Sequence, residues 1–455
     1  MQNIQNQATL TRPQVKSGLS QGMTLFTFLM GIFLGALDHS VIGPALSSIL
    51  ASYEMVPAWG SWSFSVYTLV FAVSIPVLGK LSDRFGRKQT FMFGITSFAV
   101  GSLICALAPN FTVFLLGRAV QAIGAGGIFP ITASHIAVTY PPEQRGKTMG
   151  MIGVAFGLGS ILGPTIGGMI IAYADWQWVF LINIPLCAII LLMMSQFKSE
   201  QQTMKKPIDY VGIMLLALMI VSIMLGITLG SSLFFLVGVV IAPVLFFYER
   251  KQADPVMNMN YVTKLPILIL LIGSLLSGLV MTVINIIPLF AESHLGFAKG
   301  NAGLSIAPLA IASMAASLYG GMLVDKIGAK KVLLAGFALT ALATVGLATG
   351  IENLALYYAV TIVLGFGIGI VIGAPLNILL LQVIDIREAG AAVGYLSLFR
   401  SLGSTISPAV TGKLITLFAA SGLSFTYAFS FTLTVSVVSL VLLLVFVKAK
   451  AVAKS

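Results

Sequence analysis

Long apolar segments recur along almost the whole chain and limit what it can fold into. A hydrophobic stretch of about 20 residues is long enough to cross a bilayer as one helix. The sequence therefore predicts an all-α membrane protein with fourteen transmembrane helices. The candidate spans are 23–45, 58–80, 88–108, 111–138, 147–172, 176–197, 208–227, 231–248, 265–290, 302–324, 330–350, 354–377, 389–417 and 426–448.

The composition agrees with a membrane protein and excludes an ordinary soluble one. Hydrophobic residues make up 58% of the 455 residues and charged residues 9%, whereas about 25% of a typical soluble chain is charged. The net charge of +11 fits basic cytoplasmic loops, so we expect no nucleic-acid partner. With fourteen spans both termini are cytoplasmic, and the basic loop residues fall almost entirely on that side. We expect a multi-pass protein of a bacterial cell membrane.

Two segments of the first half recur in the second half. The loop "GKLSDRFGRKQT" (79–90) matches "GGMLVDKIGAKK" (320–331), and "GLGSILGPTIGG" (157–168) matches "SLGSTISPAVTG" (401–412). Repeated halves around a central substrate path are typical of transporters. The predicted parts are a cytoplasmic tail (1–22), a six-helix bundle (23–197), a linker with two extra transmembrane helices (198–261), a second six-helix bundle (262–448) and a cytoplasmic tail (449–455).

Four motifs in this order resemble the signature motifs of the major facilitator superfamily. They are "LDHSVIGPAL" in the first span, the loop "GKLSDRFGRK", "LLGRAVQAIGAGG" in the fourth span and "GLGSILGPTIGG" in the fifth. Within that superfamily they look like the fourteen-span drug:proton antiporter branch. The resemblance implies two pseudo-symmetric bundles plus two inserted helices, alternating access, and proton-coupled multidrug efflux with antibiotic resistance. The open alternative is a lipid or glycolipid flippase, or an exporter of an endogenous metabolite such as a siderophore.

Two charged residues inside predicted spans are expected to meet. Asp38 lies about fifteen residues, or roughly 22 Å, from the cytoplasmic start of the first span. Arg118 lies about seven residues, or roughly 10 Å, below the outer end of the fourth span. In a core about 30 Å thick, both fall at similar depth. Since charges inside a membrane usually mark function, we predict that Asp38 binds the transported proton and Arg118 tunes its ionisation. A fixed pair that serves assembly alone is the alternative.

Further polar residues in or near the spans are candidate substrate contacts. They are His39, Gln121, Asn285, Asn377, Arg400 and Glu292. His39 points about 100° away from Asp38 around the helix, so it is either a structural residue or a substrate contact. Arg400 is expected to face an anionic substrate group or a partner helix. Glu292 is either a second acidic site or a solvated loop residue.

The loop at 79–90 predicts a gate between the two access states. Its candidate residues are Gly79, Asp83, Arg84, Gly86, Arg87 and Lys88, with Asp325 as the equivalent of Asp83 in the second half. Glycines permit a tight turn between helices. Asp83 can accept hydrogen bonds from a helix N-terminus or pair with a basic group, which would latch one state. The alternative is that the basic residues only fix topology.

The fifth span combines closely spaced glycines with a proline. Its members are Gly159, Gly163, Pro164, Gly167 and Gly168. Glycines four residues apart flatten one helix face, and proline bends a helix. The resemblance implies a hinge that limits leak, whereas the alternative is plain helix packing.

The sequence gives no support for an enzyme. It contains no phosphate-binding Gly-rich loop before a Lys-Ser/Thr pair, no metal-ligand spacing and no recognisable nucleophile setting. We therefore expect no cofactor and no metal, with a proton gradient as the driving force. The expected partners are a small-molecule substrate, protons and membrane lipids, and the expected oligomeric state is a monomer.

Overall fold

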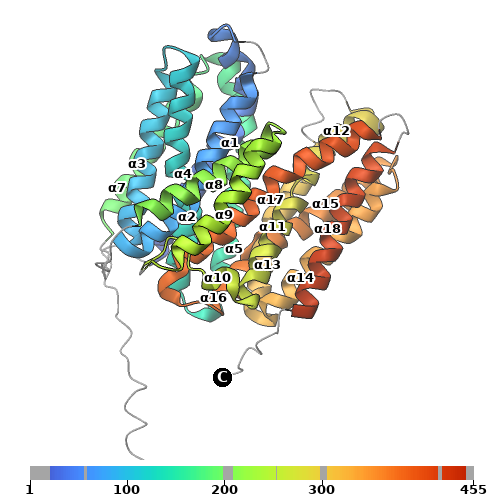
Figure 1. Ribbon diagram of the computed structural model, residues 1–455. Coiled ribbons are helices and arrows are strands. Elements are labelled where there is room, and N and C mark those ends of the chain that lie inside the picture. Colours follow the sequence, from blue (N-terminus) through green and yellow to red (C-terminus); the bar gives the residue numbers. More distant parts are fainter. Residues whose placement is uncertain are drawn as a thin grey trace, which may run out of the picture.

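The computed structural model describes residues 21–55, 59–197, 209–252, 254–297, 305–418 and 423–446, and all regular structure in them is helical. The predicted tail 449–455, residues 1–20 of the other tail and residues 198–208 of the predicted linker lie outside the described residues. The helices stand side by side and form two groups (Figure 1). We call these groups the N-terminal bundle (α1–α7) and the C-terminal bundle (α11–α18).

Capping residues and turns set the ends of the helices in the N-terminal bundle. Gly86 separates two long helices with φ 96°, a conformation that favours glycine. Asn110 accepts a hydrogen bond from the N–H of Val113 and caps the next helix. The helices are α1 (Gln21–Ser52), α2 (Gly60–Phe85), α3 (Arg87–Ala106), α4 (Phe111–Thr139), α5 (Pro142–Tyr173), α6 (Trp178–Leu181) and α7 (Asn183–Ser195).

The C-terminal bundle repeats the tight turn at Gly328, where φ is 91°. Asn353 caps α15 through the N–H groups of Ala355 and Leu356. The helices are α11 (Leu265–Val280), α12 (Val283–His294), α13 (Ala307–Ile327), α14 (Ala329–Ala348), α15 (Leu354–Ile372), α16 (Ala374–Leu381), the 3-10 helix η4 (Ile386–Glu388), α17 (Ala389–Leu417) and α18 (Ser424–Phe446).

A hairpin of two apolar helices, α8 (Tyr210–Thr228) and α9 (Ser232–Glu249), lies between the bundles in the sequence. The two helices pack against each other, and α8 also contacts α2 and α17. Figure 1 shows the hairpin in front of the junction between the bundles. The short helix α10 (Asn260–Thr263) then leads into α11.

The predicted count of fourteen spans differs from the structure. Within the described residues, twelve helices are long and apolar enough to cross a membrane. The predicted span 265–290 is divided near Met281 into α11, with 16 residues, and α12, with 12 residues. The predicted span 389–417 forms the single helix α17, which is 29 residues long and carries Arg400 and Lys413. Two predicted spans therefore account for the difference: one is interrupted between α11 and α12, and the other, α17, is more polar than a typical membrane helix.

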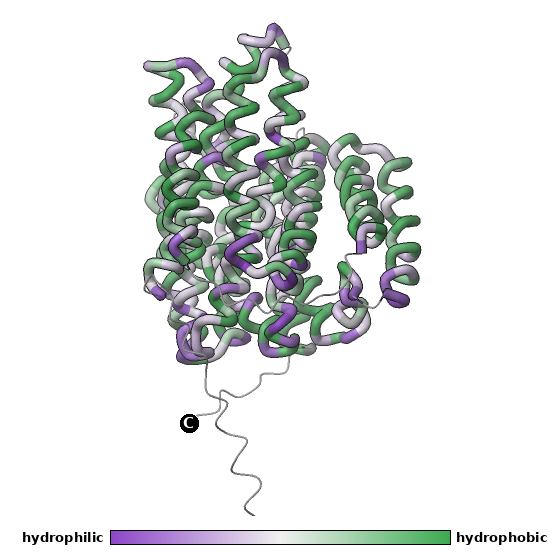
Figure 2. Tube along the Cα trace, turned by 90° about the vertical axis from the view of Figure 1, so that its left-hand side faces the viewer, coloured by the Kyte–Doolittle hydropathy of each residue, from purple (hydrophilic) through white to green (hydrophobic). Residues whose placement is uncertain are grey.

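The two ends of the molecule differ in their connections. We call the end with the turns at Gly86 and Gly328 the tight-turn end, and the end with Trp59 and Trp176 the tryptophan end. The bundles meet near the tight-turn end, through contacts of α2 and α4 with α17 and of α5 with α13 and α16. They diverge toward the tryptophan end (Figure 1). Hydropathic colouring places many hydrophilic residues at the tight-turn end (Figure 2).

Candidate functional site

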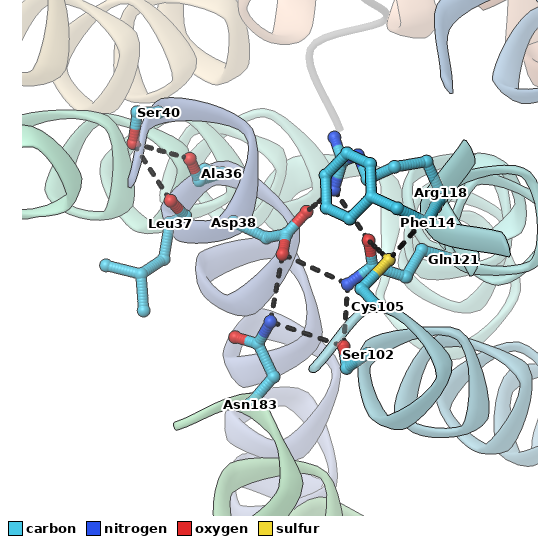
Figure 3. A network of polar contacts seen from close by, with 10 residues as sticks. All are labelled: Ala36, Leu37, Asp38, Ser40, Ser102, Cys105, Phe114, Arg118, Gln121 and Asn183. Atoms are coloured by element: carbon cyan, nitrogen blue, oxygen red, sulfur yellow. Dashed lines mark hydrogen bonds and ion pairs between the residues drawn. The ribbon is translucent and has the colours of Figure 1, made fainter. Parts of the chain in front are cut away.

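Asp38 of α1 and Arg118 of α4 form an ion pair inside the N-terminal bundle. Nη1 of Arg118 donates to Oδ2 of Asp38 at 2.9 Å. The side chains are 0% and 1% exposed, so the pair is shielded from bulk solvent. The sequence predicted that Asp38 and Arg118 lie at similar depth and could meet, and their side chains are in contact in the structure (Figure 3). Their role in proton binding stays a prediction.

Two amide side chains complete the contacts of this carboxylate, and a serine binds both amides. Oδ1 of Asp38 accepts hydrogen bonds from Nε2 of Gln121 at 3.2 Å and from Nδ2 of Asn183 at 2.9 Å. Both amides also donate to Oγ of Ser102, at 2.6 Å and 3.3 Å. Oε1 of Gln121 in turn accepts from Nη1 of Arg118 at 2.6 Å. We call these five residues the Asp38 network (Figure 3).

An aromatic ring connects the Asp38 network to His39. Cζ of Arg118 lies 4.2 Å from the ring centroid of Tyr67 in α2, within cation–π range. The same ring lies edge-on to His39, with the centroids 6.1 Å apart. Asp38 is buried, whereas His39 is exposed, which agrees with their separation around the helix. His39 therefore contacts the network through Tyr67, and its role in substrate binding stays a prediction.

Sequence reasoning missed Ser102, Asn183 and Tyr67. A single serine, asparagine or tyrosine in an apolar span gives little signal, because such residues also occur in lipid-facing and structural positions. The available signal was the isolated amide in a strongly apolar segment, since a buried amide needs hydrogen-bond partners. Asn183 begins α7 and is fully buried, which places its amide against the network.

Arg400 and Asn377, two candidates of the second half, have their described contacts outside this network. Arg400 donates from Nη1 to the carbonyl of Ile372 at 3.1 Å and from Nε to Oγ of Ser277 at 3.3 Å. Asn377 is buried in α16 and donates to the carbonyl of Gly373 at 3.3 Å. These contacts stay within the C-terminal bundle.

The two remaining substrate candidates lie on α12. Glu292 is half-buried near the end of that helix. Asn285 is also on α12, but its side chain lies outside the described residues. Their predicted roles are therefore unchanged by the structure.

Asp83 connects the N-terminal bundle to the start of α17. Its Oδ1 accepts from the N–H of Gly390 at 3.0 Å and its Oδ2 accepts from the N–H of Ala391 at 2.7 Å. The first N–H groups of a helix have no partner within the helix and carry partial positive charge, so a carboxylate is stabilised there. Gly79 allows the close approach, because a side chain at that position would meet the carbonyl oxygen of Gly390.

Asp325 makes the equivalent contact in the opposite direction. It accepts from the N–H of Gly146 at 2.8 Å and from the N–H of Lys147 at 2.7 Å, in the first turns of α5. Each repeated aspartate therefore binds backbone N–H groups near the start of a helix in the other bundle: Asp83 in the first turn of α17 and Asp325 in the second turn of α5. We call the two contacts the Asp83 latch and the Asp325 latch.

Three basic residues of the loop 79–90 contact other residues of the N-terminal bundle. Nε of Arg87 donates to Oγ of Ser134 at 2.9 Å. Nζ of Lys88 donates to the carbonyl of Ser195 at 3.0 Å. Arg84 stacks on Phe85, with Cζ 5.2 Å from the ring centroid.

A strap of residues 254–261 crosses the same end between α9 and α11. Asp254 pairs with Lys80 at 2.7 Å, and the hydroxyl of Tyr261 donates to Oε2 of Glu388 at 2.7 Å. Burial, followed by this hydrogen bond, raises the pKa of the Tyr261 phenol far above its usual range, so it stays a donor. The strap thus ties α2 and η4 to one chain segment.

The glycines of α5 pack against α1. Side chains at Gly159, Gly163 and Gly167 would collide with α1 atoms, whereas the space around Gly168 is open. Oγ of Ser40 donates to the carbonyl of Gly159 at 3.2 Å across the contact. Pro164 lies on the same helix and is exposed. These glycines make a tight helix contact, and the predicted hinge role stays a prediction.

Comparison with known families decides the class of protein. The family model described as the Major Facilitator Superfamily matches residues 28–280 and 269–455. The chain belongs to the Major Facilitator Superfamily. Members of this superfamily are membrane transporters and not enzymes, so this chain is a multi-pass transporter of small molecules.

Relatives in the Major Facilitator Superfamily include bacterial transporters. The chain is 35% identical over 423 residues to the uncharacterized MFS-type transporter YfiU of Bacillus subtilis, covering 87% of this chain and 80% of that protein. It is 29% identical to multidrug resistance protein 3 of the same species, covering 85% and 78%. The human organic anion transporter MFSD10 (TETRAN) superposes with a TM-score of 0.71 at 17% identity, covering 93% and 100%. That structural likeness shows the shared fold.

Proposed function

We propose that this transporter exports amphipathic organic compounds in exchange for protons. The observation that carries the proposal is the Asp38 network, a buried carboxylate that is held by one cation and two amides. Protonation would remove the negative charge and leave the Arg118 guanidinium without a counter-charge in a low-dielectric site, which is unfavourable. Binding and release of a proton would therefore be coupled to rearrangement of α1 against α4.

The two latches supply the second part of the proposed cycle. Both join the bundles at the tight-turn end, and alternating access requires one end to close while the other opens. In this proposal the structure represents the state that is closed at the tight-turn end. Rocking of the bundles would break both latches and open that end.

The proposed topology places the tight-turn end in the cytoplasm. The basic residues Lys80, Arg84, Arg87 and Lys88 gather there, which fits the excess of Lys and Arg on the cytoplasmic side of membrane proteins. The termini then lie in the cytoplasm, and α11–α12 together and α17 would add two crossings to the twelve helices that qualify by length and apolarity. The fourteen-span drug:proton antiporter branch has this number of crossings.

The proposed substrates are cationic or neutral and partly apolar. Multidrug resistance protein 3 is a relative along most of the chain, which supports drugs, dyes and antimicrobials as substrates. A cationic substrate would also compete with the proton for the Asp38 carboxylate. His39 and Tyr67 would offer rings for stacking beside that carboxylate.

Dye efflux in inside-out membrane vesicles tests the proposal. We expect an imposed proton gradient to drive transport of a cationic dye by the wild-type protein. Asp38→Asn should lose gradient-dependent transport, whereas Asp385→Asn, which changes an exposed carboxylate, should keep it. Full proton coupling in Asp38→Asn would refute the role of Asp38. Transport restricted to compounds with acyl chains would favour the flippase alternative.

A further inference from the structure

The base of the α8–α9 hairpin carries two acidic residues that the Asp38 network does not include. Asp209 immediately precedes α8, and Glu249 is the last residue of α9. The turn of the hairpin at Leu229–Ser231 lies at the opposite end of both helices, so the two carboxylates are neighbours at the tight-turn end. Glu249 is 1% exposed although it lies at the end of a surface hairpin.

Each carboxylate has an oxygen without a hydrogen-bond partner. Oδ1 of Asp209 accepts from the N–H of Gly212 at 2.8 Å and from the hydroxyl of Tyr248 at 3.1 Å. Oδ2 of Asp209 is buried and has no partner, and both oxygens of Glu249 are buried near the backbone N–H groups of Val256 and Met257 without completing a hydrogen bond to them. Unsatisfied buried oxygens of this kind are rare in folded proteins, so these three need an explanation.

One unsatisfied oxygen of each carboxylate lies beside Gly212. A side-chain carbon at Gly212 would contact Oδ2 of Asp209 and would lie 2.5 Å from Oε1 of Glu249. Both oxygens therefore lie close to one point, and they are no more than about 5 Å from each other. Two ionised carboxylates repel each other at this separation, and such pairs in proteins commonly retain one proton.

We propose that Asp209 and Glu249 hold one proton between them, so that the base of the α8–α9 hairpin is a proton-binding site separate from Asp38. The shared proton converts the repulsion into a hydrogen bond from one carboxyl to the other. The net charge of the pair is then −1 and not −2. The site follows from the contacts of these two residues and does not depend on the proposed transport function.

The cations around the pair are engaged with other groups. Lys80 pairs with Asp254 at 2.7 Å, and Arg387 pairs with Asp385 at 2.8 Å. Arg250 and Arg84 stack on phenylalanine rings, with Cζ 5.5 Å and 5.2 Å from the ring centroids. Among the described residues none of these cations forms an ion pair with Asp209 or Glu249, so a proton is the candidate for neutralising one of the two carboxylates.

The other groups near the pair allow one negative charge to remain. The backbone N–H groups of Val256 and Met257 lie beside the Glu249 carboxylate and stabilise a negative charge on it. Further titratable side chains share the surrounding cavity or lie against Glu249. They are Asp83 of α2, Tyr261 of α10, Glu388 of η4 and Tyr395 of α17. Those that are acidic add repulsion, which favours the singly charged pair.

Protons can reach the site from the surface. A cavity of about 520 Å³ at the tight-turn end is lined by Glu249 together with the exposed residues Arg250 and Arg387. Asp209 lines an adjoining hollow of about 20 Å³. The cavity also reaches Lys80 and Asp83, so the charge of the pair acts next to the Asp83 latch.

Infrared spectroscopy of the purified full-length protein tests the proposal directly. We expect the carbonyl band of a protonated carboxyl group at about pH 7, and we expect the band to disappear at higher pH as the pair ionises. Glu249→Gln and Asp209→Asn should each abolish it, because an amide donor replaces the shared proton. Asp38→Asn should keep it, which separates this site from the Asp38 network.

Three other outcomes would overturn the proposal. They are the absence of such a band from the wild-type protein, its survival in either Glu249→Gln or Asp209→Asn, and its loss when sodium or potassium chloride is added at constant pH. The last result would show a site for a metal cation. The wild-type titration needs no substituted protein, so the proposal stays testable if a variant does not fold.

Thermal unfolding gives a second measurement of the same proton. The folded pair binds a proton that the separated carboxylates of the unfolded chain have released near neutral pH, so the folded state binds more protons. Stability should then fall as the pH rises from about 4, where the carboxyls of the unfolded chain release their protons, to the pH at which the folded pair releases its proton, and it should be constant above that pH. Glu249→Gln should flatten this slope. An unchanged slope in a folded Glu249→Gln protein would contradict the shared proton.

Discussion

Single residues determine the electrostatics of the Asp38 network. Arg118 is the cation that compensates a carboxylate with 0% exposure, and removal of one partner from a buried ion pair leaves an uncompensated charge. We expect Arg118→Met to lower the free energy of unfolding by about 3–5 kcal/mol. Asp38→Asn combined with Arg118→Met should recover much of this loss, since no charge then stays buried.

Thermal unfolding of the detergent-solubilised proteins measures this effect, with Arg250→Met as the control. Arg250 is exposed and stacks on Phe246, so its substitution should cost much less. Equal stability of wild type and Arg118→Met would show that the pair contributes no charge compensation.

Two substitutions of Tyr67 test its cation–π contact with Arg118, because one keeps the aromatic ring and the other removes it. Tyr67→Phe keeps a ring 4.2 Å from the guanidinium and should leave stability nearly unchanged. Tyr67→Leu removes the ring and should cost about 1–2 kcal/mol beyond the loss of buried area. Thermal unfolding of the two variants and of the wild type measures these losses of stability. Equal losses in both would assign the effect to the hydroxyl instead.

At the scale of one residue, the sequence located the charges and missed their neutral partners. Asp38 and Arg118 were detectable because a charge inside an apolar segment is costly and rare. Ser102 and Asn183 were not, because their importance depends on which helices pack around α1. That arrangement is a property of the whole bundle.

At the scale of elements, the contact between α1 and α5 depends on the absence of side chains. A methyl group at Gly163 would collide with Ser40 and would lie 2.9 Å from the carbonyl oxygen of Leu37. Gly163→Ala should therefore lower stability by about 1–3 kcal/mol, as overpacking does. Gly168→Ala is the matched control on the same helix, because nothing lies within 4 Å of the added carbon.

Both glycine variants gain the same helix propensity, so their difference isolates the collision with α1. Thermal unfolding and dye efflux should be measured together. Equal stability and equal efflux of Gly163→Ala and Gly168→Ala would show that α1 can shift to make room for the added methyl group without loss of stability.

The sequence predicted helical segments better than it predicted their continuity. The apolar run 265–290 gave one expected span, but the structure interrupts it between α11 and α12. Apolar content alone does not reveal such a break. The span expected at 389–417 was found as α17, but Arg400 and its many small polar residues make it less apolar than its neighbours.

At the scale of the whole molecule, the repeat predicted the two aspartates but not the helices that they bind. Aligning the halves relates Asp83 to Asp325, and this relation needs only the sequence. The partners, at the starts of α17 and α5, come from opposite bundles, and no local pattern shows how two bundles face each other. The symmetry of the latches became visible only in the structure.

This symmetry predicts how the latches combine. Asp83 places its charge at the N-terminus of α17, an interaction that typically contributes about 0.3–1 kcal/mol and up to about 2 kcal/mol, and Asp325 accepts two backbone hydrogen bonds in the second turn of α5. Asp83→Asn and Asp325→Asn should each shift the equilibrium toward opening of the tight-turn end, by about fivefold for 1 kcal/mol. The sites lack shared partners, so the free-energy shifts should add in the double variant.

Distances between spin labels on the two bundles at the tight-turn end measure the populations, with Asp385→Asn as the control. Asp385 is an exposed carboxylate at the same end that binds Arg387, two residues away, and not the other bundle. Because one rocking motion would break both latches, each single variant should raise the same open population. A double variant that opens no further than Asp83→Asn alone would mean that Asp325 does not oppose this motion, and the two-latch description would fail.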